Sequence, residues 1–299
     1  MTRRGVHLSR QGITILSHNG SGCGYIQLPD MEEKPLPVSS SVPPVFPREK
    51  EALFRDVLKV MNACKLPYVV SGTFALHEYT GIWRDTKDLD LFVTSASMPG
   101  ILEALEDAGF LTEIHDPVWI AKCRRGEYFV DLITGMSNSV IHVDESWIHR
   151  GVASEVLGIP VRVLAPEELI ASKLFVLRRE RFDGSDIAHV LFALGRRLNW
   201  GRLLELVGEH WEMLLWALVL FRYIYPANTL DVPLEVWDLL LHRFQEDLHS
   251  PNPQAHFRGS LIDENMFAID VKEWGLRNII EDYRVKHKDK VLDAPKPIA

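Results

Sequence analysis

The sequence predicts an α+β protein, with a mixed sheet and flanking helices in the first half and an all-helical second half. Short apolar runs bounded by turn residues alternate with helical periodicity up to about residue 164. From Pro166 onward, nearly every segment has the period of a helix. The composition, 46% hydrophobic and 25% charged, is typical of a globular protein and excludes a disordered or fibrous chain.

The individual elements follow from local patterns. Residues 51–65 carry apolar side chains at helical spacing, and Pro67 ends that helix. Pro166, followed by two glutamates in the first turn, predicts one long helix through about Arg181. The other expected strands are 68–70, 89–94, 110–114, 119–123, 128–133 and 161–164, and the other expected helices are 74–79, 98–108, 185–194, 202–210, 212–225 and 234–248.

Composition also divides the chain. Residues 34–47 hold five prolines and three serines, which favour extended, solvated backbone, so residues 1–47 are interpreted as a flexible arm or linker. We expect an α/β domain at 48–165 and a helical domain at 166–299.

Charge and cysteine usage narrow the class of protein. A formal net charge of −8 argues against extended non-specific binding of nucleic acid, which cationic surfaces drive. The three cysteines, Cys23, Cys64 and Cys123, are far apart, which favours a reducing compartment, and we expect a cytoplasmic protein. No apolar run is long enough to span a membrane, and no targeting peptide is predicted.

The segment 68–93 is the most informative about chemistry. A predicted strand runs into Ser71, Gly72 and Thr73 and then into a helix, so unpaired backbone N–H groups at the helix start can bind an anion. Gly72 lets a phosphate approach the main chain closely.

Acidic side chains follow shortly after this turn. Asp88 and Asp90 begin an apolar strand, and the two-residue period places both carboxylates on one face. Asp131 supplies a third carboxylate from another apolar strand. Like charges held close together need a cation, and carboxylate oxygens on a rigid strand suit Mg²⁺.

These residues resemble the nucleotidyltransferase superfamily typified by DNA polymerase beta, and most closely the minimal and abortive-infection-toxin-type nucleotidyltransferases. The resemblance covers roughly residues 51–197, with Ser71 at the position of the first glycine of the family's turn. It rests on Gly72-Thr73, Arg84-Asp85-Thr86, Asp88-Leu89-Asp90 and the later Asp131.

The resemblance implies a nucleotidyltransferase fold for the α/β domain. It also implies transfer of a nucleoside monophosphate from an NTP to a hydroxyl of RNA such as a tRNA end, of a protein or of a small molecule, with release of pyrophosphate. Asp88, Asp90 and Asp131 would be the catalytic residues and hold Mg²⁺ or Mn²⁺, and Asp131 would also take the acceptor's proton. Ser71, Gly72 and Thr73 would contact the β and γ phosphates.

Two cations are candidate nucleotide contacts. Lys173 lies on the apolar stripe of its predicted helix, so its ammonium must reach solvent or an anion. The resemblance implies that this anion is the triphosphate or the acid cluster. Arg84 is the second candidate, although pairing with Asp85 or Asp88 is an alternative for it. The arginines near Asp183 and Asp186 are interpreted as a solvated face or helix-end ion pairs.

A protein of another class remains open. The same fold could serve as a non-catalytic nucleotide-binding or partner-binding module, regulatory or antitoxin-like, with the helical half as an interaction surface. Three crowded carboxylates favour the enzyme.

Overall fold

The computed structural model describes residues 7–9, 12–14, 44–84, 86–178, 181–287 and 292. Of the arm predicted at 1–47, the described part is two short paired strands, β1 (His7–Ser9) and β2 (Gly12–Thr14), and residues 44–47. The remainder of that prediction lies outside the described residues, as do Cys23 and Asp85.

The centre of the fold is a seven-stranded mixed sheet with the strand order β5-β6-β7-β4-β3-β9-β8. The pairs β4/β7 and β3/β9 are parallel, and the other pairs of the sheet are antiparallel. The strands are β3 (Tyr68–Val70), β4 (Asp90–Val93), β5 (Leu111–Asp116), β6 (Ile120–Arg125), β7 (Tyr128–Ile133), β8 (Val152–Val156) and β9 (Ile159–Val163).

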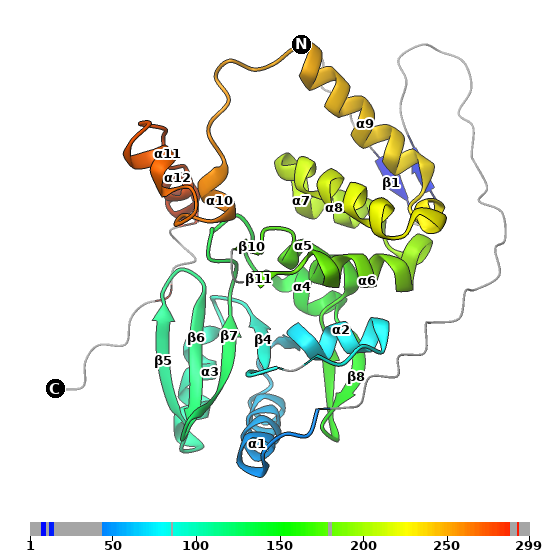
Figure 1. Cartoon of the computed structure of the whole chain (residues 1–299). Helices are drawn as coiled ribbons and strands as arrows, with labels where there is room; N and C mark the ends of the chain where they lie inside the picture. The colour runs from blue at the N-terminus through cyan, green and yellow to red at the C-terminus, as the bar shows by residue number, and fades with distance from the viewer. Residues whose placement is uncertain are drawn as a thin grey trace.

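Helices cover this sheet and continue beyond it (Figure 1). Helix α1 packs on β7, β9 and α3, whereas α2 and α4 contact β9 and β3 respectively. The helices of the α/β half are α1 (Arg48–Cys64), α2 (Gly72–Thr80), α3 (Met98–Asp107) and α4 (Glu145–Arg150). Those that follow are α5 (Pro166–Lys173), α6 (Gly184–Leu194), α7 (Trp200–Val207), α8 (Trp211–Ile224), α9 (Leu234–His249), α10 (Gly259–Ile262), α11 (Ala268–Lys272) and α12 (Ile280–Lys286).

Burial explains the central strands. All residues of β3, and Leu91, Phe92 and Val93 of β4, are buried, as expected for strands covered on both faces. One hydrophobic core extends from Phe54 of α1 through the sheet to Phe221 of α8. The predicted α+β class, with a mixed sheet followed by helices, is confirmed.

The long helix predicted from Pro166 to Arg181 is wrong. Helix α5 ends at Lys173, and the chain turns back through the short antiparallel pair β10 (Leu177–Arg178) and β11 (Arg181–Phe182). The backbone N–H of Asp183 donates to the carbonyl of Val176 across this turn. The reversal brings Asp183 back to Lys173, which lies in the protein interior and needs an anionic partner there.

Helix α4 and strand β8 were not predicted. Helix α4 has six residues, too few to show a helical period, although Asp144 caps its start by accepting from the backbone N–H of Ser146. Strand β8 has an exposed, mixed pattern because it lies at the edge of the sheet.

Candidate active site

The three predicted acids meet at the start of β4. Strands β4 and β7 are parallel and in register so that Asp90 lies opposite Asp131, and Asp88 precedes Asp90 by two residues. The backbone N–H of Asp131 donates to the carbonyl of Leu89 at 2.9 Å. One carboxylate oxygen from each of Asp88, Asp90 and Asp131 lies within 4.8 Å of the others. The side chains therefore converge on one spot from two strands.

Electrostatics show that this cluster is repulsive without a cation. Burial, followed by the negative charges of Asp88 and Asp131, raises the pKa of Asp90 to about 7. Burial also raises the pKa of Asp131, against the opposing effect of Lys122. Clustered hard oxygen ligands of this kind fit a divalent cation such as Mg²⁺. Within the described part of the chain, this is the one group of metal-ligating side chains found.

Lys122 holds the third acid. It lies opposite Asp131 on the antiparallel strand β6, and its Nζ is 2.5 Å from Asp131 Oδ1. Both side chains are about one-tenth exposed, at 12% and 10%. The Lys122 ammonium also lies 4.1 Å from the centroid of the Phe129 ring, which limits where it can move. The pair fixes Asp131 through one oxygen.

The turn at residues 71–73 lies directly beside Asp90. The backbone N–H of Ser71 donates to the carbonyl of Asp90 at 2.9 Å, and Ser71 is the N-cap residue of α2. The Ser71 side chain makes no capping hydrogen bond, so it leaves the N–H groups of the first turn of α2, which includes Thr73, uncapped. Gly72 has a φ of +60°, and a Cβ there would overlap Asp90 Oδ2. Glycine at this position lets the carboxylate pack against the turn.

Lys173 reaches an anion, as its position on an apolar stripe requires, but its direct partners are Asp183 and Asp186. Its Nζ lies 2.9 Å from Asp183 Oδ2 and 2.8 Å from Asp186 Oδ2, and all three residues are buried. Burial opposes ionisation of Asp183, yet Lys173 and Arg181 keep the pKa of its carboxyl below the ordinary value. The charge of Lys173 also opposes part of the rise in the pKa of Asp90.

Arg84 belongs to the same network. Its Nη2 pairs with Asp186 Oδ1 at 2.8 Å and lies 3.3 Å from both Ser185 Oγ and His189 Nδ1. The structure thus shows Asp186 as its partner rather than Asp88. Thr86, two residues further on, instead fixes Asp88 by donating from Oγ1 to its backbone carbonyl and carboxylate at 2.9 and 3.2 Å.

Two further residues near the acids were missed or discounted from the sequence. Lys122 could have been noticed in the sequence, because it places a cation between Ala121 and Cys123, which are buried on the same strand. Arg181 was interpreted as part of a solvated face or a helix-end ion pair, and it does pair with Asp183 at 3.1 Å. Its charge also opposes the rise in the pKa of Asp90, although its side chain is 65% exposed.

A mixed sheet whose parallel central strands bring three carboxylates to a glycine turn defines a nucleotidyltransferase-like α+β protein. The chain belongs to the family described as "Nucleotidyl transferase of unknown function (DUF2204)", whose model matches residues 50–199. This confirms the resemblance to the nucleotidyltransferase superfamily. No curated protein sequence matches the chain.

The solved structures that match part of this chain include an antibiotic-resistance factor and a lincosamide antibiotic adenylyltransferase. ANT(2")-Ia in complex with adenylyl-2"-tobramycin is 16% identical, with a TM-score of 0.40, and the match covers 59% of this chain and 99% of that one. The lincosamide antibiotic adenylyltransferase LnuA, bound to lincomycin, is 18% identical, with a TM-score of 0.34 and coverages of 48% and 95%. JHP933 from Helicobacter pylori is 16% identical, with a TM-score of 0.35 and coverages of 68% and 94%.

No helix within the described residues combines the length and the apolar character needed to cross a bilayer. Cys64 and Cys123 are both free thiols.

Proposed function

We propose that this protein is a metal-dependent nucleotidyltransferase that moves a nucleoside monophosphate from an NTP to a hydroxyl acceptor and releases pyrophosphate. The observation that carries the proposal is the convergence of Asp88, Asp90 and Asp131 beside the Gly72 turn. A binding module has no need to hold three repelling carboxylates in one place.

The acids are the proposed ligands for Mg²⁺ or Mn²⁺. Their fit to a divalent cation rests on three oxygens within 4.8 Å and on the burial and mutual repulsion that raise the pKa of Asp90. A bound divalent cation would offset the charge that develops on the attacking and leaving oxygens during transfer. Because Lys122 already donates to Oδ1 of Asp131, Oδ2 of that residue is the less engaged oxygen for the metal or for the proton of the acceptor.

The turn and the nearby cations have separate proposed tasks. Gly72 and Thr73 would bind the β and γ phosphates through backbone N–H groups at the uncapped helix start, which attract anions. Ser71 would contribute its hydroxyl, because its own N–H donates to the Asp90 carbonyl. Arg181, whose charge already acts on Asp90, would contact the triphosphate together with Lys173 and Arg84. Each of these cations has a carboxylate partner that holds its side chain in position before the nucleotide arrives.

The acceptor is an RNA such as a tRNA end, a protein or a small molecule, and we expect the reaction to take place in the cytoplasm. To test the proposal, the full chain is incubated with each α-labelled NTP and Mg²⁺ or Mn²⁺ in the presence of tRNA or a cell lysate. Transfer of label that is lost in Asp90→Asn and kept in Asp238→Asn, an exposed carboxylate on α9, supports the proposal. Binding of NTP without transfer to any acceptor would instead identify the non-catalytic module.

A further inference from the structure

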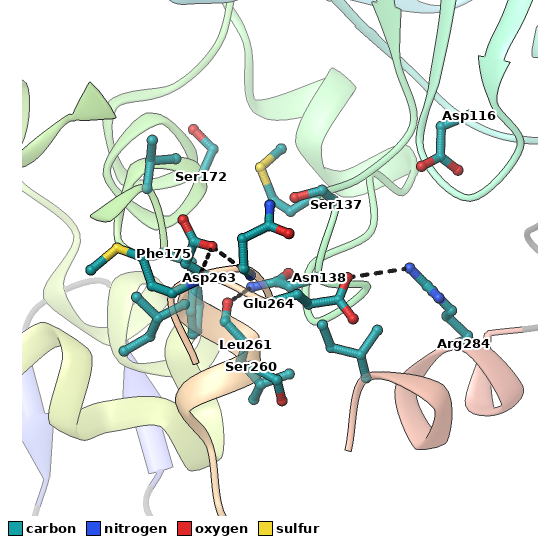
Figure 2. Close-up of a pocket in the computed structure, with 16 residues that line it drawn as sticks. Asp116, Ser137, Asn138, Ser172, Phe175, Ser260, Leu261, Asp263, Glu264 and Arg284 are labelled. Carbon is teal, nitrogen blue, oxygen red and sulfur yellow. Dashed lines mark hydrogen bonds and ion pairs between the residues drawn. The ribbon is translucent and has the colours of Figure 1, made fainter. Parts of the chain in front are cut away.

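A pocket of about 510 Å³ lies between the sheet and the C-terminal helices (Figure 2). Its walls are the loop at 136–138 after β7, the end of α5 and the following turn, α10 with the loop after it, and α12. Asp88, Asp90 and Asp131 do not line it. The volume falls within the range of roughly 300–1,000 Å³ that small-molecule sites occupy. Helices α10 and α12 lie beyond the residues matched by the family model, so only part of this pocket is formed by the matched region.

Helix α10, which forms one wall of the pocket, is hydrogen-bonded to the loop after β7. Asn138 is buried and donates from Nδ2 to the carbonyl of Leu261 in α10 at 2.9 Å, as Figure 2 shows. Leu261 and Ile280, at 2% and 1% exposure, belong to a small apolar cluster that joins α10 to α12. The pocket is therefore preformed, which reduces the entropic cost of binding.

Negative charge dominates the lining. Three carboxylates, Asp116, Asp263 and Glu264, face one guanidinium, Arg284. Arg284 is already neutralised from outside the pocket, because its Nη1 lies 2.6 Å from Glu281, whereas Nη2 is 3.9 Å from Glu264.

Among the described residues, Asp116 and Asp263 have no cationic partner. The carboxylate of Asp116 accepts from the backbone N–H of Val118 and the indole of Trp119. Asp263 accepts from two backbone N–H groups, those of Asn265 and Met266. Neither forms an ion pair with another residue in the described ranges, so each carboxylate can attract a cationic ligand and repel a phosphodiester.

The other side chains that line the pocket are apolar or uncharged polar groups. Phe175 contributes the edge of an aromatic ring that is 6% exposed, and the less buried side chains of Val176, Ile262 and Met266 add apolar surface. Ser260 also lines the pocket at 3% exposure, and its Oγ has no hydrogen-bond partner among the residues that the structure describes. A buried hydroxyl without a partner is uncommon and marks a place where a ligand can supply the missing bond.

We infer that this pocket binds a small organic cation, with an ammonium or guanidinium group near the carboxylates and an apolar body against Phe175. Binding of the cation can be tested without nucleotidyl transfer, whereas the role of the ligand rests on the proposed function. That ligand is either the acceptor of the proposed reaction or an effector of it, and the chemistry that recognises the two is the same.

The test compares two probes of equal shape. Tyramine carries an ammonium group on a phenol ring, and tyrosol carries a hydroxyl in place of the ammonium. Binding to the full chain is measured by ligand-observed NMR, with agmatine and spermidine as further cations. We expect tyramine to bind with a dissociation constant on the order of 1 mM, as for a fragment of its size, and tyrosol to bind roughly tenfold more weakly. Raising the salt concentration should weaken the binding of tyramine but not that of tyrosol.

Matched variants place the probe in the pocket. Glu264→Gln and Ser260→Ala should each weaken tyramine binding by roughly 3- to 10-fold, because each removes one polar interaction. Glu273→Gln, which removes an exposed carboxylate that does not line the pocket, should leave it unchanged. Equal affinity for tyramine and tyrosol, no binding of any of the three cations, or the same affinity in all three variants would overturn the inference. Transfer of labelled nucleotide to tyramine would identify an acceptor, and binding without transfer would identify an effector.

Discussion

Gly72 offers the sharpest test of the site, because one added methyl group acts on Asp90 directly. In Gly72→Ala, the new Cβ would overlap Asp90 Oδ2 and lie 3.0 Å from Cγ and 3.4 Å from Cβ of the same residue. The chain neighbours of Gly72 are fixed, since Ser71 donates to the carbonyl of Asp90. The carboxylate of Asp90 must therefore rotate away from the position in which it meets Asp88 and Asp131.

The expected magnitudes separate stability from activity. A residue with a side chain at a φ of +60° costs about 1–2 kcal/mol of unfolding free energy. A displacement of a metal-binding carboxylate by about 1 Å is expected to reduce nucleotide transfer by roughly 100-fold. Urea unfolding measures the first effect, and initial rates of label transfer at saturating NTP measure the second.

Gly126→Ala is the matched control for this variant. Gly126 has a φ of +62°, almost the same as Gly72, but a Cβ there would have nothing within 4 Å. It should lose a similar unfolding free energy and keep its transfer rate. If Gly72→Ala transfers label within about threefold of Gly126→Ala, the close packing of Asp90 against the turn is not what positions the acid.

Three other outcomes follow from contacts described above. Lys122→Met should lower the unfolding free energy by about 3 kcal/mol, because it leaves the Asp131 carboxylate buried without its cation, and Lys122→Met/Asp131→Asn should recover most of that loss in urea unfolding. At pH 7, Asp144→Ala should cost about 1 kcal/mol through loss of the α4 cap. Burial opposes the charge of Asp144, but hydrogen bonds from Ser146 and Trp147 lower its pKa below 3.8. The stabilising effect of Asp144 is therefore present above the unfolded-state pKa and should disappear as the pH falls through the folded-state pKa. A constant difference in unfolding free energy between wild type and variant from pH 7 to pH 2 would contradict this. Finally, MgCl₂ at ten times its dissociation constant should stabilise the chain by roughly 1.4 kcal/mol in thermal unfolding, and EDTA or Asp90→Asn should abolish that gain, whereas an equal gain in Asp90→Asn would place the ion elsewhere.

Local patterns were enough to predict most of the sheet and the three acids. Short apolar runs predicted Val69 and Leu91 as parts of strands, and the two-residue period placed Asp88 and Asp90 together. The resemblance to a known superfamily implied that Asp131 is the third acid. The parallel pairing of β4 with β7, which brings Asp131 to the other two, is not encoded in the spacing.

The errors occurred where a long-range contact overrides a local pattern. Leu169 and Leu177 fit one helical stripe, yet α5 ends at Lys173 because the buried ammonium is satisfied by Asp183 and Asp186 from the returning chain. No window of sequence around Lys173 contains that information. The same applies to Lys122, whose partner Asp131 becomes a neighbour only when β6 and β7 pair.

The backbone pairing of β4 with β7 sets the spacing of the acids. Asp90 and Asp131 are adjacent through hydrogen-bonded backbone, so their separation does not depend on the length of the connection that contains α3, β5 and β6. A slip of one residue in this pairing would turn Asp131 to the opposite face and replace it with a leucine or a valine. Insertions in the intervening hairpin are thus tolerable in principle, whereas a single deletion within β7 would dismantle the acidic trio outright.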